Sequence, residues 1–336
     1  GYRVYVNGEK VIDYWGEHAS AKRDYTLKAT AGTDYKIRIE YMQAGAEALL
    51  RFDLGIYRHI SPEMVVDRVK EADIVIFAGG ISPSLEGEEM YSVNSPGFAG
   101  GDRTSIELPQ VQRDILKALK KAGKKVVFVN CSGSAVALVP EMESCDAILQ
   151  AWYPGQSGGL AVADVLFGDF NPSGKLPVTF YKNTDQLPDF EDYSMKNRTY
   201  RYMTEVPLFP FGYGLSYTTF DISKGRLNKK TISAGQDLNF KVNVKNTGKY
   251  DGAEVIQVYV RKVDDAEGPI KSLRAFRRVP LKAGETCVVS IDLLPTTFEF
   301  FDPTTNTMRI MPGKYEIMYG NSSDIPSGNK LSVTLR

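Results

Sequence analysis

The chain has 336 residues, of which 43% are hydrophobic and 24% are charged, a composition typical of a soluble globular protein with two or three domains. Lysine plus arginine equals aspartate plus glutamate at 41 each, so there is no basic excess that would favour a nucleic acid as partner. No apolar run approaches the roughly 20 residues that a membrane-spanning helix needs, and the start of the chain is not typical of a signal peptide.

Residues 1–57 have the pattern of an all-β region. Asn7 and Gly8 lie between the alternating runs 3–6 and 10–13, which predicts a hairpin with a type I′ turn. Further strands are expected at 23–27, 35–41 and 48–52. Because the first residues already look like the middle of a strand and no methionine precedes them, we expect the sequence to be a fragment of a longer protein.

The hairpin region 5–15, together with 36–41, resembles the second half of a PA14 domain. That module is often inserted in carbohydrate-active proteins and can bind or border sugar. Trp15 and His18 are candidates for stacking on a sugar ring, although a tryptophan in a small sandwich more often belongs to the core. We therefore expect Trp15 to be a core residue.

Residues 58–180 alternate helix and strand. Ser61 and Pro62 predict an N-cap and first turn, with a helix running to about residue 71. Strands are expected at 73–78, 125–130, 147–151 and 176–180, and helices at 109–121, 134–139 and 158–167. Strands separated by crossover helices predict an α/β three-layer sandwich with a mostly parallel sheet.

An acidic loop with Glu86, Glu88 and Glu89 follows the first of these strands. It is expected at the carboxyl end of a parallel strand, where open α/β sheets bind ligands. Three close carboxyl groups without a neighbouring lysine would favour a protonated acid if partly buried, as general acid catalysis near neutral pH requires. The alternative is a solvated acidic loop with no chemistry. Glycine-rich or polar loops at 79–80, 131–134 and 152–159 are expected at the same edge.

Nucleotide-binding and serine-hydrolase signatures are absent from the sequence, which disfavours both functions. Residues 181–219 are rich in proline, tyrosine and acid, and predict an ordered linker strap whose aromatic side chains pack against a neighbour. Residues 220–336 alternate again at 237–244, 253–260, 288–293, 314–319 and 330–335. This spacing predicts a β-sandwich of the immunoglobulin or fibronectin type III kind with a structural role.

Five motifs, in this order, closely resemble glycoside hydrolase family 3. They are Glu-Gly-Glu-Glu at 86–89, Gly-Asp-Arg-Thr-Ser-Ile-Glu-Leu-Pro at 101–109, Trp-Tyr-Pro-Gly-Gln-Ser-Gly-Gly at 152–159, Asn-Pro-Ser-Gly-Lys-Leu-Pro at 171–177 and Phe-Gly-Tyr-Gly-Leu-Ser-Tyr at 211–217. The resemblance covers residue 58 to the end. It implies retaining β-glucosidases or β-xylosidases built from a (β/α)₈ barrel, an α/β sandwich and a fibronectin-like domain. It also implies that the PA14-like part interrupts the α/β domain, whose first strand would lie outside this sequence with the barrel.

In the family that the sequence resembles, an aspartate on the barrel is the nucleophile and a glutamate on the α/β domain is the general acid/base. Glu86, which is followed by glycine as in the family pattern, is the first choice for the acid/base. Glu88 and Glu89 are the second and third choices, and the alternative for those two is a solvated role that only tunes the loop.

Four further residues are candidates for substrate binding. Asp102 and Arg103 are expected to orient the loop through an internal ion pair, with direct substrate contact as the alternative. Arg198 and Tyr200 are candidates for the border of the leaving-group site, but packing of the strap is preferred for both.

The resemblance implies the C-terminal portion of an exo-acting glycosidase that removes terminal non-reducing β-linked sugars. A non-catalytic carbohydrate-binding or scaffold module is the alternative. The expected partners are a β-linked glycoside and the barrel, and a homodimer is left open. No metal ligands cluster, so no metal or other cofactor is implied, and the scattered Cys131, Cys145 and Cys287 are expected to be small buried residues. A periplasmic or secreted location follows from family analogy alone.

Overall fold

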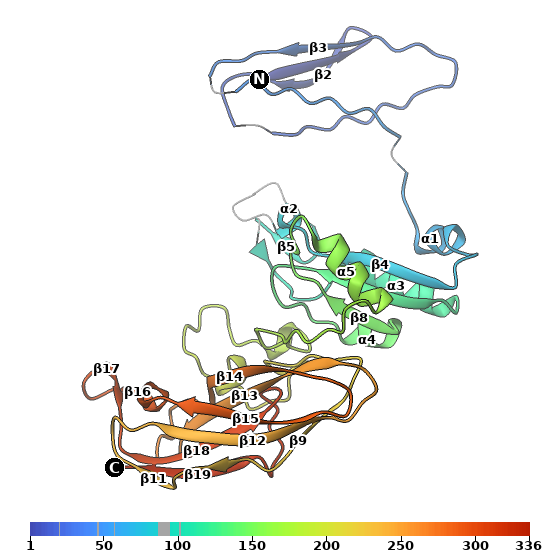
Figure 1. Ribbon diagram of the computed structural model, residues 1–336. Coiled ribbons are helices and arrows are strands. Elements are labelled where there is room, and N and C mark those ends of the chain that lie inside the picture. The colour runs from blue at the N-terminus through green and yellow to red at the C-terminus, as the bar shows by residue number, and fades with distance from the viewer. Residues whose placement is uncertain (20, 46, 57, 87–94, 101) are drawn as a thin grey trace. The chain divides into compact units, whose positions relative to one another are not determined.

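The computed structural model describes residues 1–336 except 20, 46, 57, 87–94 and 101. The chain divides into two compact units, 1–59 and 60–336 (Figure 1). Among the described residues, no helix is both long and apolar enough to cross a membrane.

The first unit contains a three-stranded antiparallel sheet in the order β2-β1-β3. Its strands are β1 (Tyr2–Val6), β2 (Glu9–Tyr14) and β3 (Ile37–Tyr41). Asn7 and Gly8 have φ values of 52° and 91°, which confirms the predicted hairpin turn because a type I′ turn needs positive φ at both positions. The backbone N–H of Lys36 donates to Asn7 Oδ1 at 2.8 Å and so ties the turn to the segment before β3.

Three predictions for this unit are wrong. The segments 23–27 and 48–52, all of them described residues, form no strand. All of these residues except the half-buried Leu27 are exposed, so the alternating pattern has no buried face to hold it in a sheet. Trp15 is not a core residue either, since its side chain is 41% exposed and the Arg3 guanidinium lies 4.4 Å from its ring centroid.

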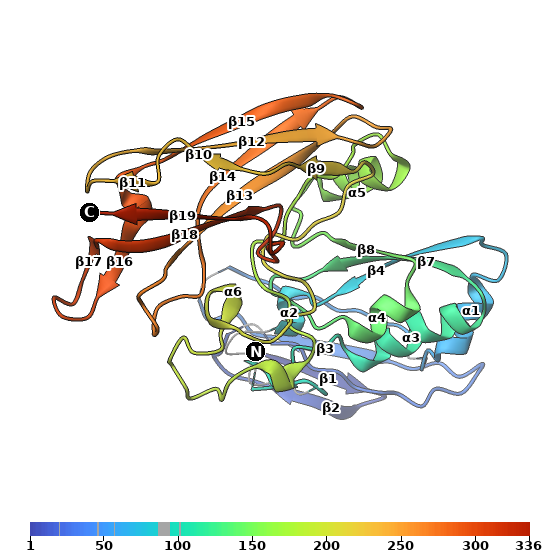
Figure 2. The same cartoon turned by 90° about the horizontal axis from the view of Figure 1, so that it is seen from below.

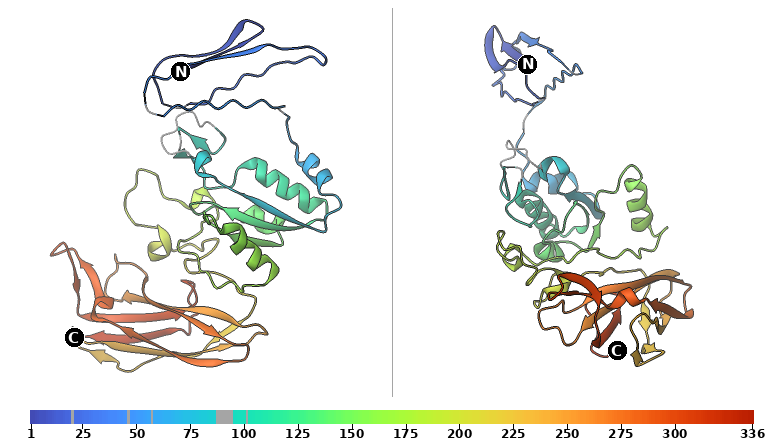
Figure 3. Two further views of the ribbon diagram at one scale, coloured as in Figure 1. Left: turned by 45° about the horizontal axis from the view of Figure 1, so that its top comes forward. Right: turned by 90° about the vertical axis from the view of Figure 1, so that its left-hand side faces the viewer.

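The second unit begins with a three-stranded parallel sheet in the order β4-β7-β8. The strands are β4 (Ile74–Gly80), β7 (Lys125–Cys131) and β8 (Ala147–Gln150), and the helices are α1 (Pro62–Arg68), α3 (Gln110–Lys121), α4 (Val139–Ser144) and α5 (Gly158–Phe167). α1, α3 and α4 lie on one face of the sheet and α5 on the other, which gives the predicted three layers (Figures 2 and 3). Val126 and Phe128 of β7 pack with Leu116 and Leu119 of α3 in the core.

The helix boundaries follow from local chemistry. Ser61 caps α1, because its Oγ accepts the N–H of Met64 at 3.4 Å, and Pro62 occupies the first turn, as predicted. The helix predicted at 134–139 is wrong: α4 starts at Val139, where Pro140 suits a first turn. The preceding residues instead follow an extended path in which the N–H of Ala137 donates to Ile106 O at 2.9 Å.

The strand predicted at 176–180 is also wrong. Its backbone does not join the parallel sheet but pairs with the end of the strap, through Leu176 N to Tyr213 O at 2.8 Å and Phe180 N to Phe209 O at 3.0 Å. Pro177 has no N–H to donate, which disfavours an interior sheet position.

Residues 220–336 form a sandwich of a four-stranded and a five-stranded sheet, with a separate two-stranded ribbon. The strands are β9 (Phe220–Ile222), β10 (Arg226–Leu227), β11 (Thr231–Ile232), β12 (Leu238–Asn246), β13 (Gly252–Lys262), β14 (Ser272–Leu281), β15 (Thr286–Leu293), β16 (Glu299–Asp302), β17 (Thr307–Ile310), β18 (Gly313–Gly320) and β19 (Lys330–Leu335). β14 was not predicted from the sequence. It lies at the edge of its sheet, where Pro280 and several arginines are tolerated and blur the alternating pattern.

The strap, residues 181–219, packs against this sandwich. It contains the short helices η1 (Thr184–Gln186) and α6 (Thr199–Tyr202). The ring of Tyr200 stacks on Phe211 at a centroid distance of 4.3 Å and meets the edge of Tyr259 at 5.7 Å. Its hydroxyl accepts the backbone N–H of Leu273 at 3.1 Å. Tyr200 and Phe211 of the strap are therefore part of the sandwich surface, as expected, whereas Phe190 and Tyr193 are 92% and 90% exposed.

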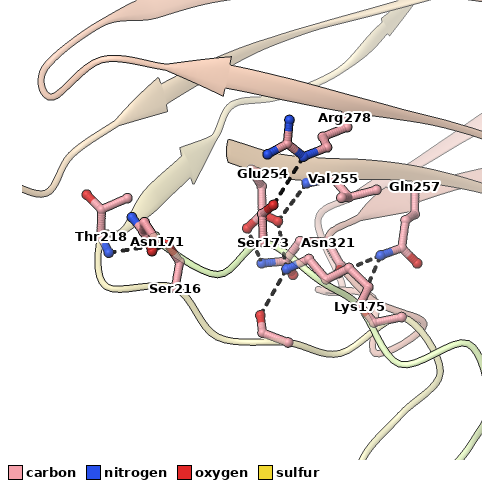
Figure 4. A network of polar contacts seen from close by, with 12 residues as sticks. Asn171, Ser173, Lys175, Ser216, Thr218, Glu254, Val255, Gln257, Arg278 and Asn321 are labelled. Carbon is pink, nitrogen blue, oxygen red and sulfur yellow. Dashed lines mark hydrogen bonds and ion pairs between the residues drawn. The ribbon is translucent and has the colours of Figure 1, made fainter. Parts of the chain in front are cut away.

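A buried ion pair joins the segment after α5 to the sandwich (Figure 4). Lys175 Nζ lies 2.7 Å from Glu254 Oε1, and the two side chains are only 12% and 6% exposed. Asn321 Nδ2 donates to the other carboxylate oxygen at 3.0 Å, and Lys175 Nζ also donates to Gly214 O at 2.9 Å. Since both charges are paired and hydrogen-bonded, the network fixes how the α/β part and the sandwich dock.

Because the ion pair is buried, removing one partner should destabilise the protein more than removing both. Lys175→Met leaves the Glu254 carboxylate buried without its cation, and we expect a loss of about 3–5 kcal/mol in the free energy of unfolding. Lys175→Met with Glu254→Leu should recover most of this loss. Urea denaturation measures the free energy of unfolding of both variants. Lys120→Met is the matched control, because the side chains of the Lys120–Asp146 pair are each more than 40% exposed. Loss of this exposed pair should lower the free energy of unfolding by at most about 1 kcal/mol. Equal losses for Lys175→Met and Lys120→Met would contradict the assignment.

Candidate active site

Glu86 lies at the carboxyl end of β4. The chain leaves β4 and turns at once into α2 (Pro83–Glu86), whose first turn is closed by Ser82. Ser82 Oγ accepts the N–H of Leu85 at 3.2 Å and Ser82 O accepts the N–H of Glu86 at 2.9 Å. This turn leaves Glu86 half-buried. The runners-up Glu88 and Glu89 lie outside the described residues.

Two hydroxyl groups hold the carboxylate of Glu86. Ser134 Oγ donates to Glu86 Oε1 at 3.1 Å, and the Tyr153 hydroxyl lies 3.1 Å from Oε2. Ser134 follows β7 and Tyr153 follows β8. Because the three strands are parallel neighbours, their carboxyl ends share one edge of the sheet, and the loops from all three meet at this one carboxyl group.

The Tyr153 hydroxyl has two acceptors within reach, Ile81 O at 2.8 Å and Glu86 Oε2. A phenol has one proton, so it donates to one of them at a time. Burial, the hydrogen bond to Glu86 and the negative charge of Glu86 all raise the pKa of Tyr153. Tyr153 is therefore protonated at neutral pH and available as a donor.

Arg103 reaches the same site through Ser134. Its Nη1 donates to Ser134 Oγ at 2.9 Å and to Ala135 O at 3.3 Å, and its Nε donates to Ser105 O at 3.2 Å. Burial lowers the pKa of Arg103, while the negative charges of Glu86 and Glu107 act in the opposite direction. Among the described residues, its buried Nη2 has no hydrogen-bond partner. The site thus holds an unused donor close to Glu86.

The expected ion pair between Asp102 and Arg103 is not formed, and both residues are described. They occupy the two-residue strand β6 (Asp102–Arg103), paired with β5 (Phe98–Ala99), and successive strand residues point to opposite faces. Asp102 is accordingly exposed and Arg103 half-buried.

A buried polar network positions the Ser134 loop. Asn130 at the end of β7 is fully buried and donates to Gln150 Oε1 at 2.6 Å. Gln150 Nε2 donates to Ser132 Oγ at 3.2 Å, and Ser132 Oγ donates to Ser134 O at 2.9 Å. The geometry of Ser134, and with it that of Glu86, depends on side chains from both β7 and β8.

Two of the glycines in these loops allow close approaches. Gly80 has a φ of 123°, and a Cβ there would lie 2.0 Å from Cys131 O. A Cβ on Gly133 would lie 2.6 Å from Cε2 of Tyr153. The aromatic ring that bears the donor hydroxyl rests directly on the Gly133 backbone, so no larger residue fits there.

The other two candidates lie in the strap. Arg198 holds the strap's own loop, since Nη2 donates to Asp189 O at 3.0 Å and to Asp192 O at 2.6 Å and Nε donates to Ser194 O at 3.1 Å. Tyr200 packs on the sandwich as described above. The structure brings Arg103 to Glu86 but places Arg198 and Tyr200 in other contacts.

Ser134 and Tyr153 were not predicted as site residues. The available signal was their position, because each follows the carboxyl end of a predicted parallel strand within a glycine-rich loop. The sequence pattern predicted that these loops meet, but it contained no information on which side chains would point toward Glu86.

Two known domain families match this chain. The glycosyl hydrolase family 3 C-terminal domain matches residues 7–217, and the fibronectin type III-like domain matches residues 254–323. The chain belongs to glycoside hydrolase family 3. Its α/β part and its C-terminal fibronectin type III-like domain are those of this family.

Family 3 relatives match over most of this chain. A xylan 1,4-beta-xylosidase of Xylanibacter ruminicola is 53% identical over 99% of the chain, and a periplasmic beta-glucosidase of Salmonella typhimurium is 38% identical over 78% of it. The chain spans 38% and 35% of the length of these two relatives.

The fold is similar to those of solved β-glucosidase structures. A β-glucosidase of Erythrobacter marinus has a TM-score of 0.71 and 34% identity, covering 82% of this chain and 36% of its own. A beta-glucosidase of Listeria innocua, solved in complex with isofagomine, has a TM-score of 0.66 and 31% identity, covering 83% of this chain and 39% of its own.

The close contact at Gly133 yields a stability prediction. Gly133→Ala forces the Tyr153 ring away from the backbone, and we expect a loss of about 1–3 kcal/mol in the free energy of unfolding. Gly159→Ala is the control, because Gly159 lies in α5 with open space around it and alanine should stabilise the helix by about 0.5–1 kcal/mol. Urea denaturation and a crystal structure of Gly133→Ala test this. An unmoved ring with unchanged stability would show that the contact is not restrictive.

Proposed function

We propose that this chain supplies the general acid/base of a retaining, exo-acting β-glycosidase that removes terminal non-reducing β-linked sugars, and that Glu86 is this residue. The observation that carries the proposal is the meeting of the loops after β4, β7 and β8 at one half-buried carboxyl group with two hydroxyl partners. The 53% identity to a xylan 1,4-beta-xylosidase over 99% of the chain favours β-xylosides as substrates, with β-glucosides as second choice.

The chemistry needs two carboxyl groups about 5–5.5 Å apart. The second, a nucleophilic aspartate, belongs by family resemblance to a barrel outside these 336 residues. Protonated Glu86 gives its proton to the glycosidic oxygen as the C–O bond breaks and the nucleophile forms a bond to the anomeric carbon. The Glu86 carboxylate then takes a proton from the water that releases the sugar.

The neighbours of Glu86 have distinct roles in this proposal. Ser134 and Tyr153 position the two carboxylate oxygens. Arg103 holds Ser134 and is a candidate for substrate contact, and the exposed Asp102 is a second candidate. Arg198 and Tyr200 act through strap packing, which their contacts support, rather than at the border of the leaving-group site.

The domain division 1–57, 58–180, 181–219 and 220–336, with 1–57 as a PA14-like part, belongs to the same proposal. A periplasmic or secreted location is supported by the periplasmic beta-glucosidase among the relatives. The alternative, a non-catalytic carbohydrate-binding or scaffold module, predicts saturable sugar binding without turnover in the intact protein.

The decisive variant is Glu86→Gln in the intact enzyme. We expect a loss of about 10²–10⁴-fold in kcat/KM on xylobiose, because a glutamine cannot protonate a poor leaving group. The loss should be much smaller on 2,4-dinitrophenyl β-xyloside, whose leaving group needs no proton. Steady-state kinetics on both substrates measure the contrast.

Three further glutamines are the controls. Glu143→Gln, on the exposed side of α4, should leave both substrates unaffected. Glu88→Gln and Glu89→Gln should have small effects. If Glu88→Gln or Glu89→Gln gave the substrate-dependent loss and Glu86→Gln did not, the acid/base would be reassigned within the loop.

A double-mutant cycle tests the positioning role of the hydroxyls. Ser134→Ala and Tyr153→Phe should each lower kcat on xylobiose about tenfold with little change in KM, since each removes one hydrogen bond of about 1.4 kcal/mol to the carboxylate. In a Glu86→Gln background the same changes should cost little more. Tyr250→Phe, an exposed tyrosine, is the control. Full additivity would show that the hydroxyls act independently of Glu86.

A further inference from the structure

Two arginines outside the candidate active site lie together without a counter-ion. Arg201 is in α6 of the strap and Arg274 is in β14 of the sandwich. The two segments are hydrogen-bonded, through Ile270 N to Arg201 O at 2.8 Å and Leu273 N to the Tyr200 hydroxyl at 3.1 Å. Neither guanidinium forms an ion pair with a carboxylate of the described residues, whereas the half-buried Arg113 is paired with Glu141.

Both guanidinium groups have unused donors. Nε of Arg201 and Nε of Arg274 are buried and have no hydrogen-bond partner within the described part of the chain, and the same holds for Oγ of Ser272. Glu299 O accepts Nη2 of Arg274 at 2.6 Å. Each guanidinium therefore keeps a buried N–H donor without a protein partner, and a buried unfilled donor is costly.

Arg274 occupies an irregularity of the sheet. In the pairing of β13 with β14, Val258 faces Ala275 and Tyr259 faces Leu273, so Arg274 is an extra residue without a partner on β13. Such a bulge redirects a side chain and is over-represented beside functional sites. The ring of Phe300 lies 4.9 Å from the guanidinium carbon of Arg274, a cation–π contact that helps to hold this side chain.

The electrostatics of the pair are unfavourable as it stands. Burial lowers the pKa of Arg274 and the positive charge of Arg201 lowers it further, while Tyr200, Glu299 and Tyr315 act in the opposite direction. Glu299 therefore attracts Arg274 from a distance without pairing with it. The positive charges of Arg201 and Arg274 therefore lie close together at the bulge, and no carboxylate of the described residues neutralises them.

We propose that Arg201 and Arg274 form a binding site for one small oxyanion, a carboxylate or phosphate group held by their free guanidinium N–H donors. The planar guanidinium matches both groups in bidentate geometry, and an oxyanion neutralises the mutual repulsion. Two sources provide this chemistry: free inorganic phosphate and the carboxylate of a uronic acid borne by a sugar.

Calorimetric titration of the intact protein with inorganic phosphate and with glucuronate, at constant ionic strength in chloride, tests the site. We expect one equivalent to bind, with a rise of about 2–4 °C in the unfolding temperature near saturation. Arg201→Gln or Arg274→Gln should weaken binding about tenfold or more. Arg277→Gln removes the same charge from an exposed position on β14 and should retain the wild-type affinity.

Unfolding in chloride alone distinguishes an anion site from a structural role. Without an oxyanion, Arg201→Gln should be as stable as the wild type or more so, because it removes like-charge repulsion, whereas Arg274→Gln also loses the hydrogen bond to Glu299 O and the contact with Phe300. Tighter binding of glucuronate than of phosphate would identify a sugar-borne carboxylate as the ligand, and the reverse would identify a free inorganic anion. The proposal is overturned if neither anion binds, or if Arg277→Gln weakens binding as much as Arg274→Gln does.

Discussion

The parallel register of β4, β7 and β8 is the constraint on which the candidate site depends. Because the strands run in one direction, Gly80, Cys131 and Gln150 all end at the same edge, and the chain must leave the sheet there three times. Each of the three loops contributes one side chain to the same cluster, namely Glu86, Ser134 and Tyr153. The buried Asn130 to Gln150 hydrogen bond locks two of these exits together. A displaced strand would separate the carboxyl group from its donors.

The second constraint is the docking of the α/β part on the sandwich. Lys175 lies in the segment that carries the chain away from the sheet and pairs with Glu254 of β13, and Gln257 of β13 donates to Gly212 O at 3.0 Å nearby. These contacts hold the end of the strap, because Lys175 also donates to Gly214 O. The strap in turn reaches the site region, since Thr184 donates to Glu107 Oε2 at 2.7 Å, four residues after Arg103. The sandwich therefore has a structural role that extends to the site through hydrogen bonds.

The sequence predicted most of the second unit because its signals are local. Ser61 with Pro62, the apolar runs of β4 and β7, and the alternation of β12 each determine one element without reference to the rest. The errors arose where tertiary pairing decides: 176–180 looks like a strand but pairs with the strap, and β14 is an edge strand that tolerates Pro280. The motif made Glu86 the candidate acid/base, and this assignment stays a prediction. Its neighbours Ser134 and Tyr153 could not be predicted, because side-chain direction in a loop depends on packing such as that of Tyr153 on Gly133.

The way Arg103 reaches Glu86 is compatible with the proposed acid/base role, in which the carboxyl group changes protonation state twice in one catalytic cycle. A direct guanidinium–carboxylate pair would favour the ionised form strongly and oppose proton donation. Here Ser134 stands between them, accepting from Arg103 Nη1 and donating to Glu86 Oε1. A hydroxyl can donate to a carboxylate and can also rotate to accept from a carboxylic acid, as the phenol of Tyr153 can. The site thus keeps a positive charge near the carboxyl group while both protonation states retain hydrogen-bond partners, which is what an acid that later acts as a base requires.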